Sequence, residues 1–179
     1  MVEAKAHLID TVKKAGPEYT YLLRHVPQVE KWANKLLDIK PEANREIVTK
    51  GVWLHDIGQV IGDKETDHAV NSELETKRFL MEQETAPDII DQVAHCVRAH
   101  RCKDVQPNTI EAKIIAVADS ASHMTDTVYV DMANRGDLLG AKEKLERDYR
   151  DVKLFPEIMD EITPLYQNWI KLLEVWPDF

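Results

Sequence analysis

The sequence predicts an all-α protein, a single-domain helical bundle of about seven to eight helices. Apolar residues recur at three- and four-residue spacing along most of the chain, as in helices with one buried face. Only 6 residues are glycine, and alternating β-branched residues are scarce. Because 179 residues suffice for one domain with a sizeable core, we treat residues 1–179 as a single domain.

The first two helices are expected over residues 3–15 and 18–39. Gly16-Pro17 separates them, since this pair stops a helix. Pro27 lies within the second range, so it must either kink that helix or lie near its true start. The second helix carries an apolar stripe of Leu22, Val26, Val29, Ala33 and Leu36.

Four further helices are expected in the middle of the chain. Pro41 is predicted to open the third helix, because proline is favoured at the first helical position. The fourth begins near His68 and is broken at residues 86–88, and the fifth covers 88–100. The sixth contains the run 112–118, whose continuous apolarity also allows a buried strand; its alanines and helical neighbours favour a helix.

The C-terminal part is expected to contain two helices. Residues 126–136 look irregular, and helices then follow at about 137–151 and 156–175. The last helix has one apolar face that indicates packing, made of Ile158, Ile162, Leu165, Trp169 and Leu172.

The sequence His55-Asp56-Ile57-Gly58 follows an apolar stretch and is the first candidate site. Its adjacent imidazole and carboxylate suit a divalent metal such as Fe, Mn, Zn, Co or Ni. A simpler explanation of the pair alone is a helix C-terminus, where His55 caps carbonyls and Asp56 is solvated.

Two other polar residues stand at positions that the helical pattern buries. His25 lies on the apolar stripe of the second helix, and Asp119 directly follows the sixth helix's apolar run. Such an acid is costly to bury unless it is paired or coordinated. His25 alone is also explained as a core histidine, and Asp119 as the partner of His123 four residues later. One metal centre, with ligands projecting inward from several helices, explains all these residues together.

In this order, His25, His55-Asp56 and Asp119 form the pattern H…HD…D, and the chain resembles the HD-domain superfamily of metal-dependent phosphohydrolases. The resemblance covers about residues 20–125, and helices 137–175 are expected to pack on that core. It implies metal ligation by His25, His55, Asp56 and Asp119. It also implies one or two divalent ions, of Fe, Mn, Co, Ni or Zn, with Mg as a further candidate.

The resemblance extends to His68 and His100, which correspond to residues that bind a second metal or the substrate phosphate. Asp56 would then bridge two metals, and Asp56 or Asp119 would accept a proton from the attacking water. His68 is alternatively an exposed residue at a helix start, and His100 a favourable cation at a helix end.

Arg98, Arg101 and Lys103 cluster near His100 and are candidates for binding the substrate. A solvated helix end, with cations that compensate its dipole, explains them equally well.

The resemblance implies hydrolysis of a small phosphate ester, a nucleotide or related metabolite, by a phosphomonoesterase or phosphodiesterase. Two other functions remain open: a di-iron oxygenase of the HD type, and a regulatory module that binds metal or nucleotide without turnover. Which phosphate is the substrate stays open.

Charge and hydropathy limit the kinds of partner that the protein can have. The formal net charge of −9 argues against a nucleic-acid polymer, but allows a small anionic substrate because bound metals dominate the local field. No apolar run approaches the roughly 20 residues that span a bilayer, and no signal peptide is recognisable, so we expect a soluble cytoplasmic protein. The four tryptophans are candidates for the core or for a homodimer contact.

Overall fold

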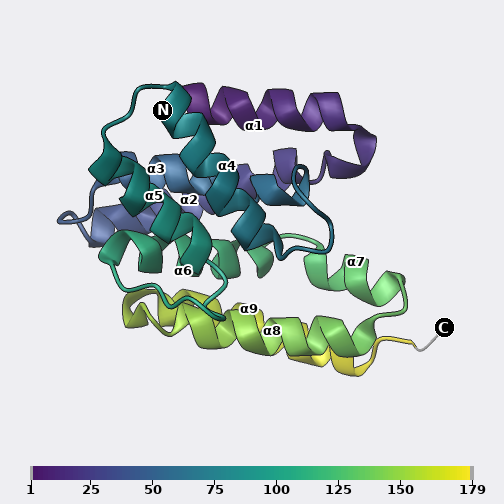
Figure 1. Cartoon of the computed structure of the whole chain (residues 1–179). Coiled ribbons are helices and arrows are strands. Elements are labelled where there is room, and N and C mark those ends of the chain that lie inside the picture. Colours follow the sequence, from purple (N-terminus) through teal and green to yellow (C-terminus); the bar gives the residue numbers. More distant parts are fainter. Residues whose placement is uncertain (1, 178–179) are drawn as a thin grey trace.

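The computed structural model of the protein describes residues 2–177 and consists of α-helices, turns and three short 3-10 helices (Figure 1). The described residues contain nine α-helices and no strand, so the predicted all-α class is confirmed, with one or two helices more than expected. The α-helices are α1 Val2–Ala15, α2 Leu22–Ile39, α3 Arg45–Leu54, α4 His68–Glu82, α5 Pro87–Ala99, α6 Ile110–His123, α7 Val128–Asn134, α8 Leu138–Val152 and α9 Met159–Glu174. The 3-10 helices are η1 Pro17–Tyr19, η2 Ile57–Gln59 and η3 Pro156–Ile158.

Helix α6 lies at the centre of the packing. It contacts α2, α3, α5 and α8, and α8 in turn contacts α7 and α9. Figure 1 shows α8 and α9 as a layer beneath α6, while α1 and α4 lie on the opposite side. Because α6 has neighbours on so many sides, the whole run from Ile114 to Ala118 is fully buried. This explains why its period alone did not distinguish a helix from a strand.

Helix α2 presents the predicted apolar stripe to the core, and all five stripe residues are buried. The helix begins at Leu22 rather than near residue 18, and Pro27 is its sixth residue. Residues 17–19 form η1 instead. Pro27 therefore removes a backbone hydrogen bond close to the first turn, where few bonds depend on it.

The prediction that Pro41 opens the third helix is wrong. Helix α3 begins at Arg45, and Asn44 is its N-cap, accepting hydrogen bonds from the backbone N–H of Glu46 at 3.0 Å and of Ile47 at 3.4 Å. A side-chain acceptor satisfies two N–H groups that otherwise lack partners at a helix start, and proline has no such side chain.

The expectation that residues 126–136 are irregular is also wrong, because they contain α7. This helix has only 7 residues and buries just Tyr129 and Ala133, which lie four apart and face α8. One pair of buried positions is too short a pattern to separate a helix from a loop. The two helices predicted after it are confirmed as α8 and α9.

The helices over residues 2–177 include none with both the length and the apolar character needed to cross a membrane.

Candidate metal centre

The His55-Asp56 pair lies where α3 turns into η2. His55 follows the last residue of α3, and Asp56 precedes η2. The N–H of Gly58 donates a hydrogen bond to the Ser72 hydroxyl of α4 at 2.8 Å. A Cβ on Gly58 would lie 2.2 Å from the carbonyl oxygen of His68, so only glycine allows α4 to approach this closely. The turn thereby brings His68 beside Asp56.

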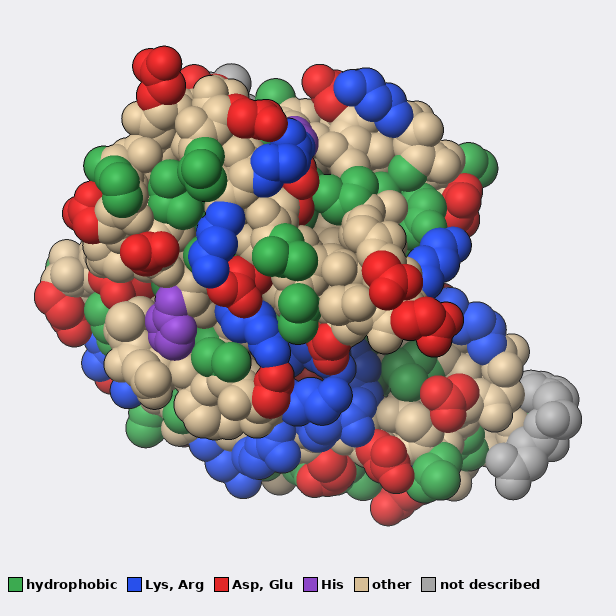
Figure 2. Space-filling model, in the orientation of Figure 1, with side chains coloured by type: hydrophobic (Ala, Val, Ile, Leu, Met, Phe, Trp, Pro, Cys, Tyr) green, Lys and Arg blue, Asp and Glu red, His purple; other side chains and the backbone are tan. Residues whose placement is uncertain are grey.

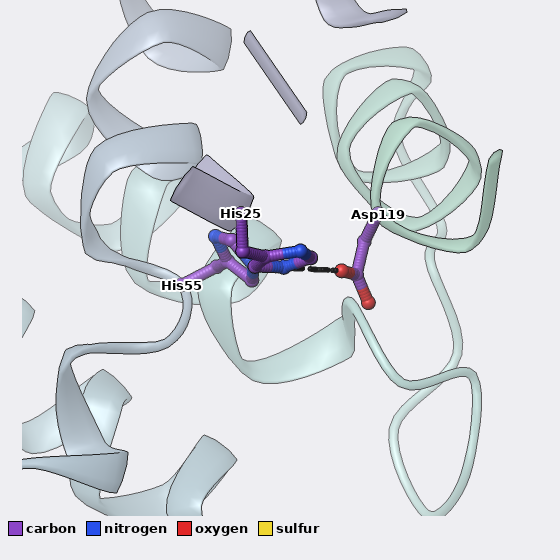
Figure 3. A group of neighbouring side chains, drawn as sticks. All are labelled: His25, His55 and Asp119. Carbon is purple, nitrogen blue, oxygen red and sulfur yellow. Dashed lines mark ion pairs between the residues drawn. The ribbon is translucent and has the colours of Figure 1, made fainter. Parts of the chain in front are cut away.

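A first cluster of metal-binding side chains consists of His25 from α2, His55, and Asp119 from α6. One ligand atom from each residue lies within 4.8 Å of the others. Nε2 of His25 lies 3.1 Å from Oδ1 of Asp119, and Nε2 of His55 lies 3.6 Å from the same oxygen. Figure 3 shows both imidazole rings directed toward the Asp119 carboxylate. Three helical segments thus bring their donors to one point.

The same three atoms lack hydrogen-bond partners. Nε2 of His25, Nε2 of His55 and Oδ1 of Asp119 are buried, and none makes a hydrogen bond of acceptable geometry within the described residues. Leaving buried polar atoms unpaired is costly. A divalent ion coordinated by all three atoms would remove that cost, so these residues fit such an ion.

A second cluster consists of Asp56, His68 from α4 and His100 at the end of α5. Oδ1 of Asp56 lies 3.3 Å from Nε2 of His68 and 3.7 Å from Nε2 of His100. The two imidazole nitrogens are 3.4 Å apart. His100 is buried, while the His68 side chain is 27% exposed, so this cluster is reached from solvent on the His68 side.

Asp56 connects the two clusters through its two oxygens. Oδ1 faces His68 and His100, whereas Oδ2 lies 3.7 Å from Nε2 of His25 and 3.6 Å from Nε2 of His55. One carboxylate with an oxygen turned to each set of imidazoles has the arrangement that a ligand bridging two ions requires.

Backbone carbonyls set the orientation of two of the imidazoles. Nδ1 of His55 donates to the carbonyl of Val52 at 2.8 Å, and Nδ1 of His100 donates to the carbonyl of Val97 at 2.6 Å. A carbonyl can only accept, so each Nδ1 carries a proton and each Nε2 can present a lone pair to the cluster. Burial and the neighbouring His55 lower the pKa of His100 to about 4, which keeps that ring neutral at physiological pH.

Both carboxylates are ionised despite their burial. Burial raises the pKa of Asp56, but His55 and the imidazoles of the second cluster hold it well below its usual range. Burial also raises the pKa of Asp119, but nearby charges, with His123 the foremost, hold it well below its usual range. Burial lowers the pKa of His25, but Asp119 and a second nearby acid raise it to about 10. The buried site therefore contains two negative charges, and buried charges are costly unless positive partners compensate them.

Side chains behind the first cluster support Asp119. Nε2 of His123 lies 3.5 Å from Oδ1 of Asp119, and Nδ1 of His123 lies 3.2 Å from Oδ2 of Asp148 in α8. Tyr129 donates a hydrogen bond to Asp148 at 2.7 Å, and Lys144 lies 3.3 Å from the same carboxylate. The predicted pairing of His123 with Asp119 is present, alongside the imidazole contacts of Asp119 rather than in place of them.

The sequence reasoning missed Asp148, although a signal for it exists. It stands in the buried stripe of α8 with Ala141, Leu145 and Val152, as Asp119 stands at the end of an apolar run. An acid within such a stripe is costly unless it is paired, and that argument had identified Asp119.

A cavity of about 1380 Å³ opens over both clusters, and Arg101 and Lys103 are among its lining residues. Arg101 forms an ion pair with Asp67, and Nζ of Lys103 lies 3.6 Å from the same carboxylate. Arg98 is not part of the lining; it pairs with Asp104 and its Nε lies 3.5 Å from Glu73. Its position therefore gives no support to a substrate-binding role for Arg98.

Comparison with known proteins found one curated relative and one family model. A curated tRNA (cytidine(56)-2'-O)-methyltransferase of Picrophilus torridus is 33% identical over 111 residues, which cover 58% of this chain and 32% of that protein. The chain thus spans about a third of the length of this relative. No solved structure matches the chain. The sequence model of the HD domain matches residues 22–124, more than half of the chain and nearly the range expected from the motifs. The chain therefore belongs to the HD-domain family.

Proposed function

We propose that the protein is a metal-dependent phosphohydrolase that acts on a small phosphate ester, a nucleotide or related metabolite. The observation that carries this proposal is the pair of His/Asp clusters that Asp56 connects, with three inward-facing ligand atoms that are buried and lack hydrogen bonds. Mixed imidazole and carboxylate donors favour Fe, Mn, Co, Ni or Zn, with Mg as a further candidate. A divalent ion bound there would lower the pKa of a water molecule and neutralise charge on the phosphoryl oxygens.

The residues of the site have separate roles in this proposal. His55 is completely buried and does not line the cavity, so its role is confined to holding an ion. The cavity lining includes the other five cluster residues, which a substrate phosphate in the cavity would meet: His25, Asp56, His68, His100 and Asp119. We assign acceptance of the proton of the attacking water to Asp56 or Asp119.

A test combines metal analysis with a panel of phosphate esters, using the wild-type chain and Asp56→Ala. We expect phosphate release by the wild type after loading with one of these metals, and loss of both metal and activity in Asp56→Ala. Arg98→Ala serves as the matched control, because Arg98 lies outside the cavity, and it should retain both. Full metal content and full hydrolysis in Asp56→Ala would refute the proposal.

A second candidate is an HD-type di-iron oxygenase. The observation that favours it is the second cluster, because four imidazoles with a bridging carboxylate also suit two iron ions. Oxygen consumption with an electron paramagnetic resonance signal from iron-loaded protein, and no phosphate release from any ester, would decide for this candidate. A regulatory module would instead retain metal and nucleotide without turnover of either kind.

The name of the matched relative makes tRNA a compound to include in the panel. The formal net charge of −9 speaks against a general nucleic-acid binder, which needs a basic face to displace counterions. We therefore propose that the substrate is small and anionic, and that the chain works without a nucleic-acid polymer or a membrane.

A further inference from the structure

The cavity over the two clusters is larger than one phosphate group needs. Its volume is about 1380 Å³. Pockets that enclose a drug-sized ligand measure roughly 300–1,000 Å³. Space therefore remains beside the clusters for a substantial second part of the substrate.

The lining of this cavity is polar rather than apolar. Among the described lining residues, Val128 and Met132 are the only aliphatic or thioether side chains, and Tyr21 is the only aromatic one besides histidines. Binding sites for uncharged organic groups are usually lined by hydrophobic and aromatic side chains. The remaining space thus suits a charged group better than an apolar one.

The charge of the lining also departs from that of the whole chain. The protein carries a formal net charge of −9, yet seven Lys or Arg and seven Asp residues line the cavity, so their formal charges cancel. Two of these acids, Asp56 and Asp119, belong to the metal clusters, and bound divalent ions would make the cavity positive. Figure 2 shows Lys and Arg side chains gathered around a hollow in the lower part of this face.

Three of the lining arginines have unused hydrogen-bond donors. Within residues 2–177, Arg24 and Arg135 form no ion pair and no side-chain hydrogen bond, and the one ion pair of Arg147, to Glu143, is 3.9 Å long. Arg101 and Arg150, in contrast, are paired with acids. A free guanidinium fork matches the oxygens of a phosphate group.

These arginines line the cavity from different elements. Arg24 precedes His25 in α2, Arg135 follows α7, and Arg147 lies in α8. Burial and the Asp56 carboxylate raise the pKa of Tyr21 to about 12, while Arg135 opposes the rise, so Tyr21 is close to both charges. Asp56, Tyr21 and Arg135 all line the cavity.

We propose that the substrate carries two phosphate groups: the reacting phosphate binds at the His/Asp clusters, and the second is held by Arg135 and Arg147. This inference rests on the proposed phosphohydrolase function and narrows its substrate class to small bisphosphates. Arg24, which precedes His25, lines the same cavity.

The test uses two pairs of compounds that differ by one phosphate: adenosine 5'-monophosphate with adenosine 3',5'-bisphosphate, and fructose 6-phosphate with fructose 1,6-bisphosphate. Phosphate release is measured with metal-loaded wild type, with Arg135→Gln/Arg147→Gln, and with the control Lys142→Gln/Lys153→Gln. The control makes the same charge change on or beside α8, at residues outside the cavity. Thermal unfolding of each protein with each compound gives a second readout that needs no turnover.

We expect the wild type and the control to prefer the bisphosphate in at least one pair, by about tenfold or more in kcat/KM. The arginine variant should lose about tenfold more kcat/KM for that bisphosphate than for the monophosphate, and lose the extra thermal stabilisation by the bisphosphate. Equal use of both compounds by the wild type, or a preference that the arginine variant retains, would overturn the inference while leaving the phosphohydrolase function standing. Cleavage of a phosphorylated RNA end but of neither bisphosphate would also overturn it. Stabilisation by bisphosphate without hydrolysis of any ester would support the two-phosphate site and contradict the proposed function.

Discussion

At the scale of single residues, the site depends on which atom of each side chain faces inward. The carbonyls of Val52 and Val97 direct Nε2 of His55 and His100 toward the clusters. The two oxygens of Asp56 divide between the clusters. A substitution that leaves every ligand in place but removes the residue that orients one of them should therefore weaken metal binding.

His123 provides the first such prediction. Its imidazole lies between Asp119 and Asp148 and stacks on His25, with ring centroids 5.0 Å apart. His123→Ala should lower metal affinity about 10- to 100-fold, because it frees the Asp119 carboxylate to reorient. Titration of the metal-free variant with Co²⁺ or Zn²⁺ measures this change.

His95→Ala is the matched control for that experiment, since His95 contacts the backbone N–H of Asn108 and belongs to neither cluster. It should bind metal as the wild type does. Unchanged affinity in His123→Ala would show that Asp119 needs no support from His123. Partial recovery of affinity in His123→Gln would indicate that a hydrogen bond, rather than ring packing, is what matters.

Gly58 gives a second prediction at this scale. A Cβ there would meet backbone atoms, the His68 carbonyl at 2.2 Å and the Ser72 nitrogen at 2.4 Å, so α4 must move. Gly58→Ala should cost about 1–3 kcal/mol of unfolding free energy. Because His68 moves with α4, the variant should also bind fewer ions per chain at saturation.

Gly51→Ala separates these two effects. The added Cβ would meet the end of the Ile115 side chain at 2.3 Å, and this side chain can rotate. Gly51→Ala should therefore alter stability but leave the number of bound ions unchanged. If Gly58→Ala keeps the wild-type number of ions, the turn does not position His68.

At the scale of elements, helix ends decide where the site residues stand. The His68 imidazole enters the second cluster from the first residue of α4, and Asp67 is the N-cap of that helix. The Asp67 side chain accepts a hydrogen bond from the N–H of Ala69 at 3.0 Å and pairs with Arg101. Asp67 thus ties the start of α4 to the segment after α5.

Asp67→Ala should lower the unfolding free energy of the metal-free protein by about 1 kcal/mol at pH 7, as loss of an N-cap does. Burial raises the pKa of Asp67, but the Ala69 N–H and Arg101 outweigh it and lower the pKa to about 2. Because this is below the unfolded value of 3.8, the carboxylate stabilises the fold above that pH. The stability difference should therefore shrink as pH falls from 3.8 toward about 2.

Urea unfolding at several pH values measures this, and Asp67→Asn is the matched control. Asparagine caps a helix as well as aspartate but does not titrate, so Asp67→Asn should keep most of the cap stability. Its difference from Asp67→Ala should not vary with pH. A wild-type advantage that persists unchanged at low pH would contradict the role assigned to the carboxylate.

At the scale of the whole molecule, the sequence predicted what depends on local pattern. Helical spacing identified α2, α5 and α9, and the ordered motif identified the residues that the fold gathers into the clusters. The motif predicts these residues because His55 and Asp56 are adjacent and the others stand at buried or terminal positions of helices. A single reading of the chain can detect both features.

What the sequence did not predict depends on tertiary contacts. The start of α3 was misplaced because proline and asparagine both signal a helix start, and the capping geometry decides between them. The support of Asp119 by Asp148 requires α8 to pack against α6. The ion pairing of Arg98 with Asp104, and the free donors of Arg135 and Arg147, likewise follow from the folded arrangement alone.

The central claim is that Asp56 joins two metal sites in one chain. The most direct test is elemental analysis of purified protein after loading with Mn²⁺, Fe²⁺, Co²⁺, Ni²⁺ or Zn²⁺ and removal of free metal, comparing the wild type with Asp56→Ala. The structure predicts two ions per wild-type chain for the preferred metal and fewer than one for Asp56→Ala, because each cluster loses an oxygen. A wild-type chain that binds none of these metals in stoichiometric amount, or an Asp56→Ala chain that still binds two, would contradict it.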